Sequence, residues 1–351
     1  MLTSDIEKIL PRTNWRENLV TSYSKPYTIW DTDTTNLASK QGAEYGRLLP
    51  LADGSWLSVY STYSENGILQ IARSNDNCRT WAVISTLSEE GRDLENGQML
   101  QLPNGDILLA DRSVIWFRSY RLDVFKSTDL GQSWTKISTI DSAEGAAGTL
   151  GNPDKGLYEP HMGFLDDGRI AVFYANEKHV TGSPAYSQIV SERISSDGGH
   201  TWGEEIWVAW DGNTPDLRPG MPVFTRMGDG RYIVVFEIVG LGNADIHYKI
   251  SDDGVSWSEG NGTYIPEQGG APYVLKLEDN TLVVSSSEGK LSFSYDNGSS
   301  WHINSLSPWN RNIKAWTSLY RIAADEIACV ADVDMGDGEN SVQVKFGIIA
   351  G

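Results

Sequence analysis

Short apolar runs alternate with polar turns along most of the chain. In residues 47–57, for example, Asp53-Gly54 separates two apolar runs. The pattern recurs at intervals of roughly 50–60 residues, which is typical of a repeat architecture. An Asp-Gly or Asn-Gly pair between two apolar runs is a strong β-hairpin signal. Six hairpins are therefore predicted, and their turns lie at Asp53, Asn104, Asp167, Asp229, Asp279 and Asp325.

A second pattern, Ser-x-Asp-x-Gly-x-Ser/Thr-Trp, follows the hairpin in the first five units. Clear copies occupy residues 127–134, 195–202 and 294–301. Residues 74–81 are a degenerate copy with Cys78 in place of Gly, and residues 251–257 are a shortened one. The Asp accepts backbone N–H groups, the Gly permits a positive φ, and the Trp fixes the turn to the sheet. We interpret these turns as structural, each joining a second pair of strands.

Two hairpins in each of six units predict an all-β, six-bladed β-propeller. The sixth unit has no second turn and ends in a strand at 342–349, so a strand near Tyr27 is expected to complete the last blade. Residues 1–351 then form one domain with an N-terminal extension at 1–26. A parallel β-helix is the alternative, but its period is far shorter.

The composition limits the classes of partner. The formal net charge of −19 argues against nucleic acid and anionic membrane surfaces, and no apolar run of membrane-spanning length exists. Cys78 and Cys329 lie in different repeats, so we expect neither a disulfide nor a metal cluster. We expect a monomer that needs no cofactor. The charged first fifteen residues lack a signal-peptide core, which leaves a cytoplasmic location and export with a removed signal both open.

Aligning the six units on their turns identifies the residues at the open face. The face away from the tight turns carries the starts of first strands and the ends of second strands, where sites are expected. Eight residues before the turn stand Tyr45, Asn96, Glu159, Met221, Ala271 and Thr317. Six before stand Arg47, Gln98, His161, Val223, Tyr273 and Leu319. On an unbroken strand both sets point the same way. Eight after stand Ser61, Arg112, Ala175, Glu237, Ser287 and Val333.

Two carboxylates stand out in this alignment. Glu159 in the third unit and Glu237 in the fourth are predicted to reach the same mouth of the ring from neighbouring blades. Glu237 interrupts an apolar strand, which costs free energy unless the charge is used or paired. Two carboxylates at one cavity are the equipment of glycoside hydrolysis, one as proton donor and the other as nucleophile or base. The alternative is that both form salt bridges with Arg47, Arg112 or Arg218.

Further residues near the mouth are candidates for substrate binding. They are Arg47, Asn96, Arg112, His161, Arg218, Tyr273 and Trp316. Each has a structural alternative. His161 either contacts substrate or only packs, and Trp316 either stacks on a sugar or fills the core. Arg218 either binds hydroxyl groups or pairs with Glu237. The acidic turns at 166–168 and 252–254 fit hairpin chemistry better than a calcium site.

The second set of turns resembles the Asp boxes (BNR repeats) of sialidase-superfamily propellers. Within that superfamily, residues 158–160, 167–169 and 174–177 resemble one catalytic strand pair of glycoside hydrolase family 93, and 218–223 with 236–237 resemble the other. Residues 270–273 fit the same family's fifth blade. The resemblance implies a metal-independent, retaining exo-α-L-arabinanase that releases arabinobiose from α-1,5-linked arabinan. It also implies Glu159 as nucleophile and Glu237 as acid/base. The apolar flanks of Glu237 likewise favour Glu237 as proton donor.

Two other functions remain open from the sequence. A sialidase would clamp a sugar carboxylate with three arginines, for which Arg47, Arg112 and Arg218 are available, but the sixth unit offers no inward tyrosine because Tyr320 has the wrong parity. A non-catalytic carbohydrate-binding or scaffold propeller is the other alternative. It predicts that Glu159 and Glu237 are locked in ion pairs with no open pocket beside them.

Overall fold

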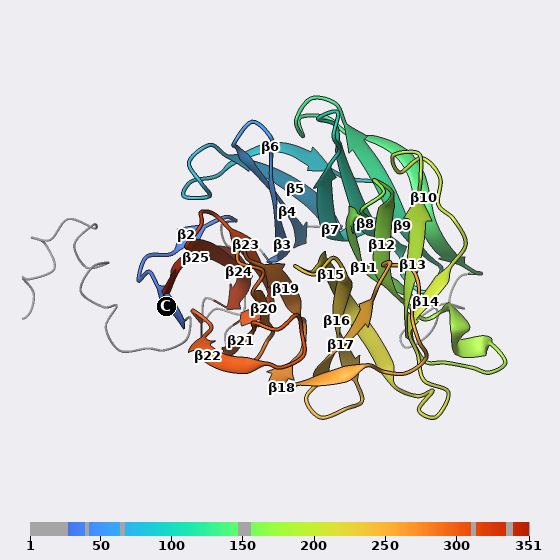
Figure 1. Cartoon of the computed structure of the whole chain (residues 1–351). Helices are drawn as coiled ribbons and strands as arrows, with labels where there is room; N and C mark the ends of the chain where they lie inside the picture. The colour runs from blue at the N-terminus through green and yellow to red at the C-terminus, as the bar shows by residue number, and fades with distance from the viewer. Residues whose placement is uncertain are drawn as a thin grey trace, which may run out of the picture.

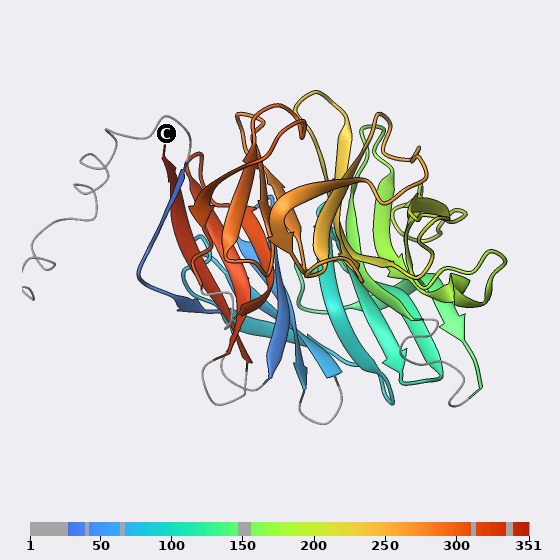
Figure 2. The same cartoon turned by 90° about the horizontal axis from the view of Figure 1, so that it is seen from below.

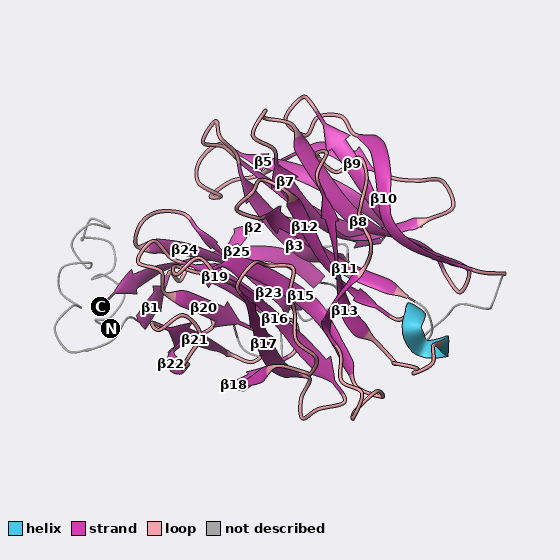
Figure 3. Cartoon of the chain, turned by 45° about the vertical axis from the view of Figure 1, so that its right-hand side comes forward, coloured by secondary structure: helices cyan, strands magenta, loops and turns pink. Residues whose placement is uncertain are grey.

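The computed structural model describes residues 27–38, 42–63, 67–146, 156–309, 314–334 and 340–350. Within these ranges the elements are β-strands, apart from one short 3-10 turn, η1 (Lys178–Thr181) (Figure 3). None of the helices in this part of the chain has the length and apolar character to cross a membrane. The strands form six sheets around an axis (Figure 1), which confirms the six-bladed propeller. The extension predicted at 1–26 lies outside the described residues.

The first three blades are four-stranded antiparallel sheets numbered outward from the axis. Blade 1 contains β3 (Ala43–Pro50), β4 (Trp56–Tyr63), β5 (Gly67–Ser74) and β6 (Ala82–Leu87). Blade 2 contains β7 (Asp93–Gln101), β8 (Ile107–Ile115), β9 (Ser119–Ser127) and β10 (Thr135–Glu144). Blade 3 contains β11 (Leu157–Phe164), β12 (Ile170–Asn176), β13 (Ile189–Ser195) and β14 (Ile206–Ala209). Figure 2, viewed from the side of the ring, shows the strands running between its two faces.

Blades 4 and 5 repeat this order, and blade 6 combines both ends of the described chain. Blade 4 contains β15 (Arg218–Arg226), β16 (Tyr232–Val239), β17 (Asp245–Ser251) and β18 (Thr263–Gly269). Blade 5 contains β19 (Tyr273–Lys276), β20 (Leu282–Ser285), β21 (Lys290–Ser294) and β22 (His302–Leu306). Blade 6 contains β23 (Lys314–Arg321), β24 (Glu326–Asp334), β25 (Asn340–Ala350) and β1 (Tyr27–Trp30), with β2 (Thr35–Asn36) also paired to β25.

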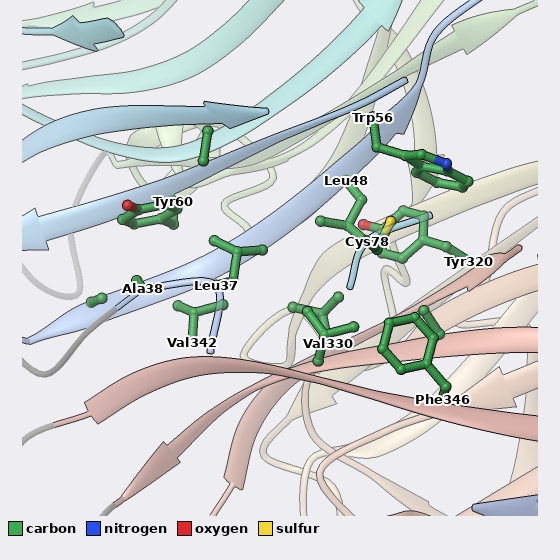
Figure 4. Packing of buried hydrophobic residues seen from close by; sticks show 14 residues of the cluster. Leu37, Ala38, Leu48, Trp56, Tyr60, Cys78, Tyr320, Val330, Val342 and Phe346 are labelled. Atoms are coloured by element: carbon green, nitrogen blue, oxygen red, sulfur yellow. The ribbon is translucent and has the colours of Figure 1, made fainter. Parts of the chain in front are cut away.

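The ring closes as the sequence predicted. Strand β1 pairs antiparallel with β25 and supplies the fourth strand of blade 6. At the neighbouring junction, Val330 and Phe346 of blade 6 pack with Leu48 and Trp56 of blade 1 (Figure 4). Burying these side chains between blades 6 and 1 joins the two ends of the repeat array by hydrophobic contact as well as by strand pairing.

The core is divided into six apolar clusters, one between each pair of neighbouring blades. Strands inside a blade have both faces covered, which explains the continuous apolar runs such as β12, whose seven residues are all buried. A seventh cluster lies at the axis and contains Tyr45, Met221 and Ala271 with Trp316 beside them. These residues come from four different blades, so their side chains converge on the centre of the ring.

The turns that carry Ser, Asp and Trp are structural, as predicted. In blade 2, Asp129 Oδ1 accepts the Ser133 N–H at 2.9 Å, and the Trp134 indole N–H donates to Ser85 Oγ of blade 1 at 3.2 Å. Blade 3 repeats this link, since the Trp202 indole donates to Ser138 Oγ of blade 2 at 3.1 Å. Each of these two turns therefore stabilises its own hairpin and fastens its blade to the previous one.

A bulge interrupts the first strand of the blades near the open face. Pairing shifts between Tyr158 and His161 in blade 3, and equivalent shifts occur in blades 1, 2, 4 and 6. The residue at this point has a φ of 46° to 58° in all six blades: Tyr45, Asn96, Glu159, Met221, Ala271 and Trp316. The assumption of unbroken strands was wrong. The bulge changes the direction of the earlier set, so the two sets do not share strand parity: Tyr45, Met221 and Ala271 converge with Trp316, whereas Val223 and Leu319 pack between blades.

The sixth unit is displaced by one residue from its predicted alignment. The N–H of Ile322 bonds to Glu326 O, as the N–H of Leu51 bonds to Ser55 O in blade 1. Ala324 is therefore the counterpart of Asp53, and the predicted turn residue Asp325 follows one position later. Trp316 replaces Thr317 in the bulge, and Asp332 replaces Val333 as the counterpart of Glu237. The sixth unit has no Asp-Gly pair, so the position of its turn could not be located from the sequence.

Candidate active site

A cavity of about 310 Å³ opens between blades 2, 3 and 4. Its walls combine two carboxylates, two arginines and a small number of neutral side chains. The lining residues are Arg112, Tyr158, Glu159, Gln188, Arg218, Glu237 and Val239. Both predicted catalytic residues therefore face one space, and we call it the Glu159–Glu237 cavity.

Glu159 occupies the bulge of β11, where its φ of 57° directs the side chain away from the strand ladder. Its Oε2 accepts the backbone N–H of Met221, the bulge residue of blade 4, at 3.0 Å. The carboxylate is thus held by the next blade. Because a backbone amide cannot rotate away as a long side chain can, this bond fixes the carboxylate with little loss of freedom.

Glu237 lies near the end of β16, and its register partner is Gly220 of β15. Its Oε2 accepts the N–H of Ala271, the bulge residue of blade 5, at 2.6 Å. The two carboxylates are therefore anchored by the same device in successive blades. Among the described residues neither of them forms a salt bridge, because the nearby cations pair elsewhere.

The pKa values of both carboxyl groups are raised. Burial and, to a smaller extent, the negative charge of Glu237 together raise the pKa of Glu159 to about 7, against the opposing effects of the Met221 N–H, Arg112 and Arg218. Burial also raises the pKa of Glu237, where the Ala271 N–H and Arg218 act in the opposite direction. The two groups line the same cavity, and the charge of Glu237 contributes to the raised pKa of Glu159. At neutral pH this interaction favours a proton on Glu159 and a negative charge on Glu237.

Arg112 of β8 lines the cavity and pairs with Glu95 of β7, with 2.9 Å between Nη1 and Oε2. Its guanidinium carbon lies 4.6 Å from the Tyr158 ring centroid and 5.0 Å from that of Trp116. The Nε of Arg112 is buried and has no hydrogen-bond partner among the described residues. It is therefore an unsatisfied buried donor on a residue of the cavity wall.

Arg218 at the start of β15 is held by Glu177, a fully buried carboxylate, and by Gln188 Oε1 at 3.1 Å. Glu177 Oε2 also accepts the Tyr158 hydroxyl at 2.8 Å. The expected alternative pairing of Arg218 with Glu237 does not occur. As with Arg112, the buried Nε of Arg218 has no partner within the described part of the chain. Glu177 thus positions two cavity-lining side chains.

A second cavity of about 440 Å³ adjoins the first at Val239 and extends between blades 4 and 5. Its lining is mostly small residues and backbone: Gly240, Gly242, Asn243, Ala244, Gly269, Gly270 and Ser287. No charged side chain belongs to this lining. The two cavities together form an elongated site that is charged at one end and neutral at the other.

Four of the predicted substrate-binding residues lie around the axis and outside both cavities. The guanidinium carbon of Arg47 lies 3.8 Å from the Tyr45 ring centroid, and its Nη1 donates to Trp316 O at 3.2 Å. The ring centroids of His161 and Tyr273 are 6.1 Å apart. Burial, with the charge of Arg47, lowers the pKa of His161 to about 3, so His161 is neutral. These contacts describe a packed axial cluster.

The structure adds a third carboxylate that the sequence alignment missed. Asp332 is the counterpart of Glu237 in blade 6, and its two oxygens accept the N–H of the bulge residue Tyr45 at 3.1 and 2.9 Å. Only 1% of Asp332 is exposed. Burial raises its pKa to about 8. It therefore lies in a closed environment, in contrast to Glu159 and Glu237.

Sequence reasoning therefore found part of the cavity and missed the rest. Arg112 and Arg218 lie where they were expected, while Asn96 occupies the bulge of blade 2 and is not part of the cavity lining. Tyr158 and Glu177 belong to phrases already singled out from the sequence, but their roles depend on partners in other strands. No motif in the sequence marked Gln188 or Val239 as part of the site. No group of three potential ligands capable of holding a metal ion occurs among the described residues.

The molecule is thus a sialidase-like six-bladed propeller with a pair of carboxylates in a cavity on its open face. No family model matches the sequence. No curated protein matches it either. Solved structures do share its fold.

The glycoside hydrolase family 93 α-L-arabinofuranosidase of Fusarium graminearum, determined with arabinobiose, is 20% identical, with a TM-score of 0.77 over 89% of this chain and 97% of that one. The α-L-arabinanase of Penicillium chrysogenum, also complexed with arabinobiose, is 21% identical, with a TM-score of 0.77 over 91% and 98% of the two chains. The NanB sialidase of Streptococcus pneumoniae is 11% identical, with a TM-score of 0.63 over 91% and 70%. The resemblance in fold that the sequence indicated is confirmed. At these identities the likeness establishes the fold.

Proposed function

We propose that this protein is a retaining glycoside hydrolase that acts on α-1,5-linked L-arabinan-type chains, with Glu159 and Glu237 as its catalytic pair. One observation carries the proposal: two carboxylates from neighbouring blades share one cavity, and each is held by a backbone N–H instead of an arginine. A scaffold propeller would have used these groups in ion pairs. A carboxylate that is held in place, has no cationic partner and borders an open cavity can act as a proton donor or as a nucleophile.

The pKa directions favour an assignment opposite to the one that the family resemblance implies. Glu159, with its pKa of about 7, is protonated in about half of the molecules at neutral pH, and the protonated form donates to the glycosidic oxygen. Glu237, whose charged form is favoured by the Ala271 N–H and by Arg218, attacks the anomeric carbon as the C–O bond breaks, forming a glycosyl ester. Glu159, now a base, removes a proton from water. That water attacks the anomeric carbon and releases Glu237.

The neighbourhood of the pair suits a neutral sugar. Arg112 and Arg218 are each neutralised by their own buried carboxylate, and each keeps one unpartnered Nε–H beside the cavity among the described residues. The neutral second cavity gives room for a further sugar unit. The arabinobiose in the two arabinan-degrading neighbours supports an arabinose-containing ligand for this fold. Action from the chain end is an expectation taken from the same resemblance.

A sialidase is less well supported. Its three-arginine clamp would need Arg47 beside Arg112 and Arg218, yet Arg47 is 3% exposed and packed against Tyr45 in the axial cluster. The remaining two arginines are already paired with carboxylates, which lowers their attraction for a sugar carboxylate.

A product assay on linear α-1,5-arabinan beside sialyllactose tests the proposal. Arabinobiose is the expected product, and NMR of the first product is expected to report retention of anomeric configuration. Retention corresponds to carboxyl groups about 5–5.5 Å apart, and inversion to about 6.5–9.5 Å. Release of sialic acid would support the other enzyme, and no product from either substrate would support a binding protein. Either result would overturn the proposal.

A further inference from the structure

Two exposed aromatic side chains stand at the tip of the β8–β9 hairpin, on the same face as the Glu159–Glu237 cavity. Trp116 is 47% exposed and Phe117 is 50% exposed. Large apolar side chains together at a surface mark a binding site more often than a chance exposure. This hairpin continues the strand that carries Arg112, so the pair lies just beyond the cavity wall.

Phe117 combines two unfavourable features. Its φ is 59°, in the left-handed region where the β-turn closed by the Arg118 N–H and Ile115 O would normally carry Gly or Asn. A bulky residue in this conformation is strained. Its ring also stays half in water. Asn or Gly at this position would relieve both costs.

Trp116 is held in a fixed orientation. Its indole N–H donates to Asp93 Oδ2, and its ring lies edge-on to Tyr120, with 6.2 Å between ring centroids. Tyr120 in turn lies 6.3 Å from Tyr158, which lines the cavity. An ordered aromatic ring with one accessible side suits the apolar C–H face of a sugar and pays little conformational entropy on binding.

Arg112 connects this hairpin to the cavity. Its guanidinium contacts the rings of Trp116, Tyr120 and Tyr158 at 5.0, 5.8 and 4.6 Å, and the same side chain lines the cavity. A chain of side-chain contacts therefore links the cavity wall to Trp116, the neighbour of Phe117. It leaves the cavity on the blade 2 side, away from the second cavity on the blade 5 side.

We infer that Trp116 and Phe117 form an aromatic platform that binds the carbohydrate chain where it leaves the cavity. The inference rests on the proposed function for the identity of the chain. A short oligosaccharide ends inside the cavity and does not reach the platform. A long chain packs on both rings, so the platform confers a preference for polymer.

The test uses Phe117→Ala and Trp116→Ala, with Tyr295→Ala as the matched control. Tyr295 is 40% exposed but lies in a tight turn of blade 5, on the opposite face. On arabino-oligosaccharides of increasing length, each platform variant is expected to lose about 3- to 10-fold in kcat/KM on the longest substrates and nothing on the shortest. A loss that is equal at all lengths, or absent, would overturn the platform.

A binding measurement separates this inference from the proposed activity. Electrophoresis in gels containing linear arabinan is run in a Glu159→Gln background, so the polymer is not consumed. Weaker retardation of Phe117→Ala than of the control supports the platform even if the wild-type protein hydrolyses nothing. Equal retardation of all variants, or none of the parent, overturns it. Dimerisation that disappears in Phe117→Ala, measured by light scattering, also overturns it because a second copy would then be the occupant.

Discussion

The same hydrogen bond occurs at the junctions between blades 3 and 4, 4 and 5, and 6 and 1, but its surroundings differ. In each, a carboxylate accepts the N–H of the next blade's bulge residue: Glu159 from Met221, Glu237 from Ala271, and Asp332 from Tyr45. Glu159 and Glu237 border a cavity, whereas Asp332 is 1% exposed behind Tyr45 and Arg47.

The difference lies in what surrounds the carboxylate. At the axis, Tyr45, Met221, Ala271 and Trp316 fill the space that the bulges create. Between blades 2 and 4, that space stays open, because the flanking side chains Arg112 and Arg218 are drawn to Glu95 and Glu177. A carboxylate that accepts the next blade's bulge N–H is thus a structural cap where packed side chains enclose it, and it becomes a candidate catalyst where its neighbours leave it accessible.

The largest expected effect comes from removing the accessible carboxylates. Glu159→Ala and Glu237→Ala should each lower kcat on arabinan by about a thousandfold or more, because each removes proton transfer or the nucleophile. Asp332→Asn should stay within about threefold of the wild type if Asp332 is only a cap. Circular dichroism confirms that the variants fold. An Asp332→Asn variant as inactive as the other two would erase the distinction between the junctions.

The next effect concerns the buried support of the cavity. Glu177→Gln removes the charge that holds Arg218 and weakens the acceptor of the Tyr158 hydroxyl, so kcat/KM should fall about 10- to 100-fold with folding retained. Glu192→Gln is the matched control. Glu192 is a buried carboxylate of the same blade that accepts the Trp257 indole N–H at 2.8 Å and does not line the cavity. Similar losses in both variants would point to a general structural effect.

The pH profile distinguishes the two catalytic roles. Glu159 must be protonated to act as acid, so kcat/KM should decline about tenfold per pH unit above the pKa of about 7. Glu237 must be ionised, and its raised pKa places the acidic limb above the usual range for glutamate. With an aryl glycoside whose leaving group needs no proton, Glu159→Gln should retain the first chemical step and lose the basic limb. A basic limb that persists in Glu159→Gln would exclude Glu159 as the acid.

The buried carboxylate Asp332 should affect the free energy of unfolding and leave the catalytic rate unchanged. Because burial raises the pKa of Asp332 to about 8, the folded state binds a proton that the unfolded state has released above pH 4. The free energy of unfolding therefore falls as pH rises from about 4 to 8. Asp332→Asn removes this dependence, so it should match the wild type near pH 4 and exceed it at pH 9 by about 5 kcal/mol, the equivalent of a rise of about four pKa units. Urea unfolding at both pH values measures this, and equal differences at both would contradict the burial argument.

The smallest expected effect is that of metal removal. Dialysis against a chelator should leave both kcat and the melting temperature unchanged, since the proposed reaction uses two carboxylates and the described residues contain no cluster of potential ligands. Activity that is lost on dialysis and restored by a divalent cation would require a different mechanism.

Much of the fold was predictable because its signals are local. An Asp-Gly turn or a Ser-Asp-Trp turn fixes its own hairpin through bonds within a few residues, as Asp129 and Ser133 illustrate. The prediction of unbroken inner strands was wrong because no single residue type marks the bulge. In blades 1, 2 and 3 the bulge residues are Tyr45, Asn96 and Glu159. The sixth unit was misaligned where the turn lacks its signal, and this hid Asp332.

The candidate site was predictable only in outline. Glu159 and Glu237 were found because a repeated alignment shows which positions reach the open face. The partners of Arg112 and Arg218 were not, since Glu95 and Glu177 are chosen by contacts across strands. The same holds for the proton: apolar flanks in the sequence favoured Glu237 as donor, whereas the surroundings of the pair favour Glu159.

By itself the sequence determined the number of blades, the closing strand and the two acidic residues at the mouth, because turn chemistry and repeat spacing are read along the chain. Only the tertiary structure decided which carboxylates remain accessible, which arginines are already neutralised and which group retains a proton. These properties depend on burial and on charges brought together from different blades. Neither the burial of a side chain nor the charges around it can be derived from the sequence of any single strand.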